Sequence, residues 1–198
     1  MVPDRFPLGR LIFFVTGNVH KFGEARKVLA EYSVAVAMLR EKASEIQDDD
    51  IENIAKVGAL DAANRTRLPV IVEDAGLFIE CLRGFPGPYS RYVYRTIGKD
   101  GILKLLGNRE GRRAEFRSVV AFSSPGQTPT CFWGVVEGRI AETIRGSSGF
   151  GFDPIFEPSE APGRTFGEMT ADEKNRLSHR ARALRRFVEW YRTSCLAS

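Results

Sequence analysis

The sequence predicts an α/β fold, because hydrophobic strands alternate with helices in its first half, paired strands follow in the middle, and helices return at the end. Of its 198 residues, 43% are hydrophobic and 27% are charged, which is typical of a globular protein with its own core. This length suits one domain or two lobes. We therefore expect one domain over residues 1–198, with helices covering both faces of a sheet.

The first predicted unit is a buried strand followed by a helix. Leu11 to Val15 is rich in β-branched and aromatic residues, and apolar residues then recur at helical spacing from Val19 to about Glu31. The turn between them, Thr16 to Lys21, contains a glycine, so backbone N–H groups can converge on an anion at the helix N-terminus. The ordinary alternative is a strand–helix turn in which Asn18 caps the helix. The Walker A pattern is absent.

A second unit of the same kind follows. The segment from Val34 to Leu39 predicts a strand, and an acidic stretch then runs from Glu41 to Glu52. The next helix is predicted from Ile51 to Arg67, because Pro69 lies just beyond its end. The run from Val70 to Val72 is a third buried strand, so this half of the chain favours a sheet covered on both faces.

Two adjacent carboxylates, Glu73 and Asp74, come directly after this third strand. We expect them at the edge where open α/β sheets bind ligands. Such residues are ordinarily solvated turn residues, but Mg²⁺ prefers carboxylate oxygens and keeps several waters for substrate phosphates. Glu45, in the preceding acidic stretch, could complete a cation site, although by itself it is one of many acids there.

The middle of the chain predicts an antiparallel lobe, and the end predicts helices. The expected strands are Ala114–Phe122, Thr130–Val136 and Arg139–Ile144. Thr170 and Glu173 form a capping-box pattern, and Ser178 is expected to cap the longer helix that follows. That helix carries an apolar stripe, interpreted as core packing, made of Ala183, Leu184, Phe187, Val188 and Tyr191.

Two further segments are candidates for binding a nucleotide base. In the loop from Gly149 to Pro154, two aromatic residues between glycines could present ring faces to a planar base, with Asp153 as an acceptor. The alternative there is a β-turn with two core aromatics. Lys174, His179 and Arg180 gather at a helix junction, where the alternative is a solvated basic face.

Composition narrows the class of protein only partly. The net charge of +4 suits an anionic ligand and nucleic acid equally well. Cys81, Cys131 and Cys195 show no metal-type or redox-type spacing, which indicates free thiols in a reducing compartment. The apolar run at Leu11–Val15 is too short for a signal peptide or a membrane span, so we expect a cytoplasmic protein that does not enter a membrane.

Taken together and in this order, these segments resemble the inosine triphosphate pyrophosphatase family, also called the HAM1-like or dITP/XTP pyrophosphatase family. The matching segments, from about Leu11 to Trp190, are TGNVHKFGE, SEIQ, VEDAGLFIECLRGFPGPYS, GFGFDPIF and TFGEMTADEKNRLSHRARAL. The resemblance implies a mixed α/β fold with a central twisted sheet, flanking helices and a cleft between two lobes. It also implies a homodimer that cleaves ITP, dITP and XTP to the monophosphate and pyrophosphate with Mg²⁺.

The resemblance further implies roles for individual residues. Asp74 matches the proton acceptor for the attacking water and, with Glu45, a magnesium ligand; Glu73 beside it is a further candidate ligand. The residues that would bind substrate are Thr16, Gly17, Asn18, Val19, His20, Lys21, Ala75, Phe150, Gly151, Phe152, Asp153, Lys174, His179 and Arg180.

Selectivity would follow from the oxygen acceptor at the 6-position of hypoxanthine and xanthine, where adenine has an amino donor. Arg180 or a protonated His179 would pair with that oxygen. This chain departs from the family at Ala75, where Ser or Thr is usual, and at Phe152, where Tyr or Trp is common. A family lysine is replaced by Val57, so the neighbouring Lys56 is left outside the predicted site.

Two other functions stay open from the sequence. One is a Maf-like pyrophosphatase that acts on modified pyrimidine nucleotides, against which the GFGFDP and SHR segments argue. The other is a nucleotide-binding or nucleic-acid-binding module without catalysis, suggested by the pI of about 9.1 and the arginine-rich C-terminal helix. The carboxylates at Glu45 and Asp74 weigh against it, so a stable complex with nucleic acid is not expected.

Overall fold

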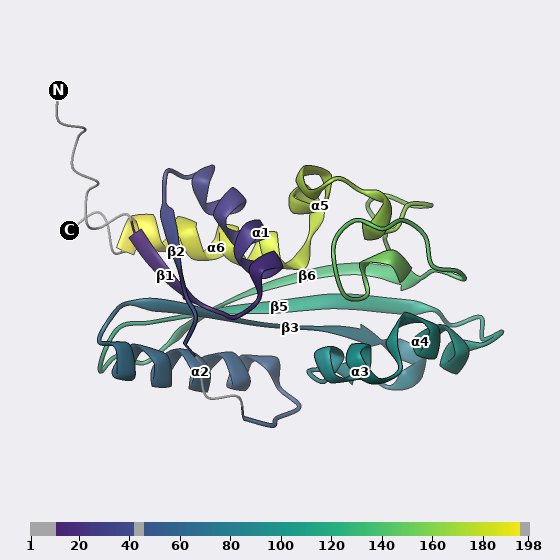
Figure 1. Cartoon of the computed structure of the whole chain (residues 1–198), viewed down its shortest axis with the longest axis horizontal. Helices are drawn as coiled ribbons and strands as arrows, with labels where there is room; N and C mark the ends of the chain where they lie inside the picture. Colours follow the sequence, from purple (N-terminus) through teal and green to yellow (C-terminus); the bar gives the residue numbers. More distant parts are fainter. Residues whose placement is uncertain (1–10, 42–45, 195–198) are drawn as a thin grey trace.

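The computed structural model describes residues 11–41 and 46–194, and it confirms the predicted mixed α/β fold (Figure 1). The helices are α1 (Val19–Ala30), α2 (Ile51–Thr66), α3 (Ser90–Thr96), α4 (Gly98–Leu106), α5 (Ala171–Leu177) and α6 (His179–Ser194). The strands are β1 (Leu11–Val15), β2 (Ala35–Leu39), β3 (Val70–Ile79), β4 (Pro86–Gly87), β5 (Arg113–Ser123), β6 (Thr130–Ile140) and β7 (Phe156–Pro158). Short 3₁₀ turns lie at η2 (Glu80–Leu82), η3 (Asp153–Ile155) and η4 (Phe166–Glu168).

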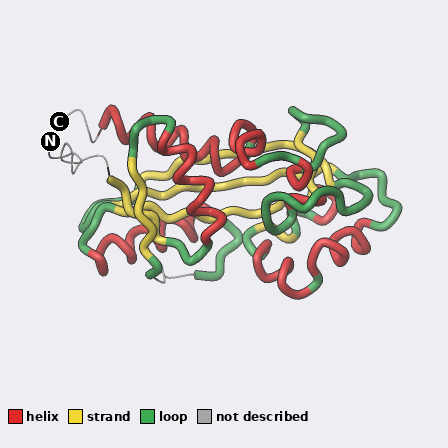
Figure 2. Tube along the Cα trace, turned by 45° about the horizontal axis from the view of Figure 1, so that its top comes forward, coloured by secondary structure: helices red, strands yellow, loops and turns green. Residues whose placement is uncertain are grey.

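One mixed sheet runs through the whole molecule. Its order is β2-β1-β3-β5-β6-β7, with β4 paired to β3. The pairs β1–β2 and β1–β3 are parallel, and the other pairs are antiparallel. The long strands β3, β5 and β6 extend along the length of the elongated molecule, and helices lie on both sides of them (Figures 1 and 2). The predicted parallel and antiparallel halves therefore meet at β3, which pairs parallel with β1 and antiparallel with β5.

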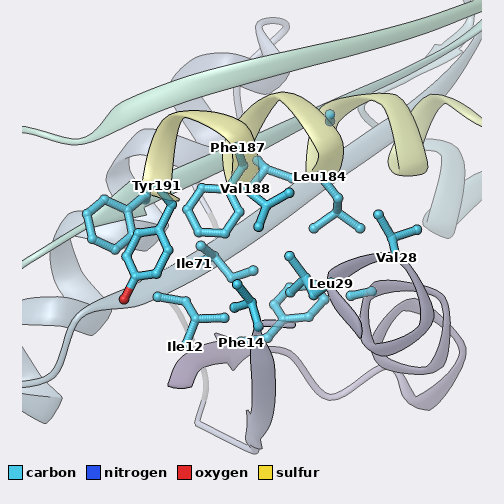
Figure 3. Packing of buried hydrophobic residues seen from close by; sticks show 14 of the residues in the cluster. Ile12, Phe14, Val28, Leu29, Ile71, Leu184, Phe187, Val188 and Tyr191 are labelled. Carbon is cyan, nitrogen blue, oxygen red and sulfur yellow. The ribbon is translucent and has the colours of Figure 1, made fainter. Parts of the chain in front are cut away.

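The hydrophobic core is divided between the two faces of this sheet. On one face, α1 and α6 pack over β1, β3 and β5, where Leu184, Phe187 and Val188 meet Ile12 and Ile71 (Figure 3). The apolar stripe of α6 is therefore core, as predicted. On the other face, α2 covers β3 and β5. A third cluster joins α3 and α4 to the η3–η4 segment at the far end of the sheet.

Some predicted elements differ from the observed ones. The third strand does not stop before the carboxylates, since β3 continues to Ile79 and pairs with β5 along its whole length. The predicted strand Arg139–Ile144 is wrong: β6 itself reaches Ile140, and the chain then turns so that Ala141 donates to the Ile155 carbonyl at 2.8 Å. Within the described residues, no helix is long and apolar enough to cross a membrane.

The first turn of α6 sits directly on β6 at Gly134. A Cβ at this position would overlap the carbonyl oxygen of His179 and lie 2.6 Å from the backbone nitrogen of Ala183. Arg182 donates to the Val135 carbonyl at 3.0 Å, and Arg186 donates to the Trp133 carbonyl at 2.7 Å. Because of this close packing, the position of the α6 N-terminus is fixed by the sheet.

Candidate active site

β3 has an open edge at its centre. Its pairing with β1 ends at Ile71, and its pairing with β4 begins at Leu77, so no strand among the described residues pairs with residues 72–76 on that side. The Glu73 carbonyl accepts from Nζ of Lys21 at 3.2 Å there, and the Leu77 N–H donates to Oγ of Ser90 at 2.8 Å. Backbone groups of alternate residues point the same way along a strand, so Ala75 directs its N–H and C=O toward this edge.

Glu73 and Asp74 point to opposite faces of the sheet, because successive side chains alternate along a strand. Glu73 shares its face with Ile71 and reaches α1 and α6. Asp74 shares its face with Val72, on the side covered by α2. The two carboxylates therefore act in different surroundings, although they are adjacent in sequence.

The Glu73 side chain is buried among cations from two helices. Lys21 Nζ lies 2.8 Å from one carboxylate oxygen, and Arg180 Nη2 lies 3.1 Å from the other. The hydroxyl of Ser118 donates to the same carboxylate at 2.6 Å. Burial alone would raise the pKa of Glu73, but Arg180 and Lys21 outweigh it and hold the pKa far below its usual range. Glu73 is therefore a fixed negative charge that anchors both cations.

The turn before α1 delivers Lys21 to this position. The Asn18 side chain accepts from the N–H groups of His20 at 2.9 Å and Lys21 at 3.2 Å, so it caps the helix. The Thr16 hydroxyl accepts from the Asn18 N–H at 3.1 Å. The local geometry of the turn from Thr16 to Lys21 is therefore that of the ordinary alternative, a strand–helix turn capped by Asn18. Gly17 and Val19 are exposed beside it, with Val19 56% exposed.

A residue absent from the sequence prediction, Glu24, connects the helices around the site. Its carboxylate lies 2.7 Å from Nζ of Lys174 and 2.5 Å from Nη1 of Arg180. Lys174 also lies 2.7 Å from Oδ2 of Asp153. The available signal was spacing: Glu24 follows Lys21 by three positions on α1, and residues so spaced share a helix face.

Burial and ion pairing have opposite effects on the pKa values of Glu24 and Asp153, and a different one prevails at each residue. Burial would raise the pKa of Glu24, but Arg180 and Lys174 outweigh it and lower the pKa. For Asp153, burial prevails over the attraction of Lys174 and raises the pKa above its usual value. The exposed fraction is 3% or less for Lys174, Arg180 and Asp153, so water screens these interactions little.

The two aromatic residues of the glycine-rich loop have different positions. Phe150 stacks on His20 at a centroid distance of 5.2 Å, and the cations of Lys174 and Arg180 lie 4.7 and 5.3 Å from its ring. Phe152 is buried in the far core cluster, where its ring and the ring of Tyr94 make a T-shaped contact. Phe150 therefore faces the predicted site, and Phe152 anchors the loop in the hydrophobic core.

The conformation of this loop depends on its glycines. Gly149 has φ +74°, and a Cβ there would collide with the carboxylate of Asp153, which accepts from the Phe150 N–H at 2.8 Å. Gly151 also has a positive φ, +61°. This region of backbone space favours glycine. The loop thereby holds Phe150 next to Lys174.

His179 is buried and stacks on Phe116 with a centroid distance of 4.6 Å and an interplanar angle of 10°. Burial lowers the pKa of His179 well below its usual value, and the cations Arg180 and Lys174 lower it further. The ring is therefore neutral at neutral pH. Of the two groups predicted to meet a base oxygen, Arg180 carries the charge.

Most of the predicted site residues thus meet around Phe150 and the open edge of β3. Glu45 lies outside the described residues. Within the described parts of the chain, no His, Cys, Asp or Glu side chains form a group of three arranged to hold a metal ion. A carboxylate such as Asp74 nevertheless fits Mg²⁺, which binds through one or two carboxylates plus substrate phosphates and waters.

Comparisons with known proteins agree with this architecture. The Ham1 family model matches residues 12–190. A dITP/XTP pyrophosphatase of Methanopyrus kandleri is 51% identical over 183 residues, covering 92% of this chain and 97% of the relative. One from Thermococcus kodakarensis is 52% identical over 177 residues, covering 89% and 95%. The solved structure of a HAM1 protein from Coxiella burnetii superimposes with a TM-score of 0.79 at 29% identity, covering 93% and 99%.

The match spans β1 to α6 and includes every segment that contributes to the cluster around Phe150 and Arg180. With a core, a sheet order and a site that all lie within the matched residues, the chain belongs to the Ham1 family.

Proposed function

We propose that this protein hydrolyses dITP, XTP and ITP to the nucleoside monophosphate and pyrophosphate. The observation that carries the proposal is the position of Lys174 and Arg180 over the Phe150 ring, with Lys21 joined to Arg180 through Glu73 at the open edge of β3. The curated relatives with about half of their residues identical are dITP/XTP pyrophosphatases, which supports the same substrates for this chain.

The phosphates would lie along the open edge of β3. Lys21 already reaches this edge, and its ammonium can exchange the Glu73 carbonyl for a phosphate oxygen. Ala75 turns its backbone N–H to the same side, which supplies a donor where the family has a hydroxyl. We expect Thr16 to Lys21 to complete this end of the site.

Asp74 and Glu45 would hold Mg²⁺, which neutralises phosphate charge and orders the attacking water when bound. Asp74 would accept the proton of that water. We give Glu73 a positioning role, because its oxygens already bind Lys21, Arg180 and Ser118. It keeps two cations at a fixed separation, so little reorganisation is needed when a triphosphate binds.

The base would stack on Phe150, with Arg180 donating to the oxygen at the 6-position. An amino group there would face a donor and leave buried polar atoms unpaired, which disfavours adenine. His179, neutral and stacked on Phe116, would bound the pocket from below. Phe152, Gly151 and Asp153 shape the loop that carries Phe150.

A panel of nucleoside triphosphates with Mg²⁺ tests the activity, with pyrophosphate and orthophosphate measured separately. We expect pyrophosphate from dITP, XTP and ITP at rates far above those for ATP and GTP. Orthophosphate as the first product, or equal turnover of ATP, would contradict the proposal. Turnover of UTP or methylated nucleotides would favour the Maf-like alternative. Salt-dependent DNA or RNA binding without hydrolysis would favour a binding module.

The variant Asp74→Asn tests the proposed base. Its kcat should fall by roughly 10²- to 10⁴-fold, since general base catalysis is worth about that much, while its melting temperature stays near that of the wild type. Asp100→Asn, at an exposed position in the first turn of α4, is the matched control and should keep full activity. Full activity of Asp74→Asn would show that the assignment is wrong.

We also propose that the protein is a cytoplasmic homodimer. Aromatic and aliphatic side chains around α3 are exposed: Phe85, Tyr89, Tyr92, Tyr94 and Ile97. An exposed group of this kind is typical of an interaction surface. A second copy of the chain is the partner that supports a symmetric interface there.

A further inference from the structure

His20 belongs to the turn expected to bind phosphates, but its side chain contacts the glycine-rich loop. The imidazole stacks on the Phe150 ring with a centroid distance of 5.2 Å and an interplanar angle of 19°. The next residue, Lys21, contacts Glu73 at the open edge of β3 instead. Successive side chains of a helix point about 100° apart, so these two leave α1 in different directions. One turn of the chain therefore reaches two different parts of the site.

The backbone of α1 fixes the place from which the His20 side chain starts. The His20 N–H donates to the Asn18 side chain at 2.9 Å, so this residue is held by the helix cap. Glu24 lies four positions further on, and residues so spaced share a helix face. Glu24 pairs with Lys174 and Arg180. The face of α1 that carries His20 is therefore the one that meets the cations around the glycine-rich loop.

The Phe150 ring lies outside the hydrophobic core formed by the described residues. Phe152 is part of the far core cluster, but Phe150 belongs to none of the three clusters found in residues 11–41 and 46–194. Its ring meets the imidazole of His20 and the cations of Lys174 and Arg180. The two cations are at most 3% exposed, whereas His20 is exposed. The imidazole therefore covers Phe150 from the solvent side.

We propose that His20 is a positioning residue for the base: its imidazole backs the Phe150 ring while the base enters between this ring and the two cations. A base in that place separates Phe150 from Lys174 and Arg180, so the ring keeps only its stack with His20. Offset-stacked rings attract each other, and a ring held before binding costs less entropy to order. This assignment rests on the proposed function, and it gives His20 to the base rather than to the phosphates.

The test measures kcat and KM for ITP in His20→Ala and His20→Phe. In His20→Ala the KM should rise roughly 2- to 10-fold, which is the usual contribution of one aromatic pair, while kcat stays within about twofold. His20→Phe keeps a ring against Phe150 and should return the KM to within about twofold of the wild type. Because His20 is exposed, the melting temperature of both variants should stay near that of the wild type.

Inorganic tripolyphosphate, which has no base, separates a role at the base from a role at the phosphates. Its inhibition constant against ITP should be the same in His20→Ala and the wild type. Arg26→Ala, at another exposed position of α1, is the matched control and should change neither the KM nor this constant. If the inhibition constant rises with the KM, His20 serves the phosphates and the proposal fails. It also fails if His20→Phe does not restore the KM, or if the KM of His20→Ala is unchanged or lower.

Binding of inosine monophosphate separates this proposal from the proposed function. Calorimetry of the whole protein should show roughly 2- to 10-fold weaker binding to His20→Ala than to the wild type, and near wild-type binding to His20→Phe. This result would support the role of His20 even if the wild type released no pyrophosphate from ITP. Equal binding to His20→Ala and the wild type would overturn that role and leave the proposed hydrolysis untouched.

Discussion

The charged side chains of the site can be buried because each one is paired with a side chain of opposite charge. Arg180 lies between Glu24 and Glu73, and these two carboxylates outweigh burial and raise its pKa further above its usual value. Removing one partner of a buried pair commonly destabilises a protein by about 3–5 kcal/mol, because the other charge is left without compensation. The cations are thus held in place before any nucleotide arrives, which favours a preorganised site.

His179 gives this arrangement a measurable pH dependence. Its folded-state pKa lies well below the unfolded value of 6.5, so below pH 6.5 the unfolded chain takes up a proton more readily than the folded chain does. The unfolding free energy should therefore decrease as the pH falls, by up to about 1.4 kcal/mol per pH unit. Urea unfolding at pH 7, 6 and 5 measures this slope. In His179→Gln this contribution should be gone, and an identical slope in both proteins would contradict the buried neutral ring.

At the level of elements, much of the fold was predictable because local pattern and tertiary structure agree. The predicted strand Leu11–Val15 has the same bounds as β1, and the capping box of Thr170 and Glu173 is present at α5. The length of β3 was missed because charged residues usually end a strand. Glu73 continues this one only since Lys21 and Arg180, far apart in sequence, neutralise it.

The site itself was predictable mainly through the family resemblance. Local sequence cannot tell Phe150 from Phe152, since both stand between or beside glycines; only packing against His20 or Tyr94 separates them. Glu24 was missed for a similar reason, because its partners come from α5 and α6, about 150 residues further along. The helices α3 and α4 were not predicted, and the short turn between them leaves no long apolar pattern.

The close contact between the first turn of α6 and Gly134 of β6 leads to a prediction about the packing of these two elements. Gly134→Ala places a methyl group against the backbone of His179, so α6 must move away from the sheet and displace Arg180. The unfolding free energy should fall by about 1–3 kcal/mol, and kcat/KM for dITP should fall with it.

Gly23→Ala on α1 provides the opposite case. A Cβ at Gly23 meets no atom of the described part of the chain within 4 Å, so this variant should stabilise the helix by roughly 0.5–1 kcal/mol. Denaturant unfolding and steady-state kinetics of both variants check the comparison. Unchanged kinetics in Gly134→Ala would mean that the site does not depend on the close packing of α6 against β6.

At the scale of the whole molecule, one continuous sheet links core clusters at both ends. We therefore propose that residues 1–198 form a single two-lobed domain rather than two independent ones, with the predicted cleft where the lobes meet beside β3. The long strands β3 and β5, paired from Val70 to Ile79, support this proposal since a break in one lobe would interrupt the ladder in the other.

The exposed aromatic surface around α3 leads to a prediction about assembly. Sedimentation velocity should show the wild type as a dimer, and Tyr92→Glu should shift it to a monomer, because Tyr92 is 69% exposed within the chain and a buried charge there would be costly. Leu60→Glu, on α2, is the control and should remain dimeric. A monomeric wild type would contradict the proposed assembly.

The opposite orientation of Glu73 and Asp74 also has a consequence for how this family can change. Deleting one residue between Pro69 and Glu73 would rotate every later side chain of β3 to the other face. Asp74 would then meet Arg180, and Glu73 would turn toward α2, while the composition of the site stayed the same. The number of residues from Pro69 to Asp74 therefore determines which face of the sheet each carboxylate occupies. We expect natural variation in length to accumulate in the loops outside β3 rather than within it.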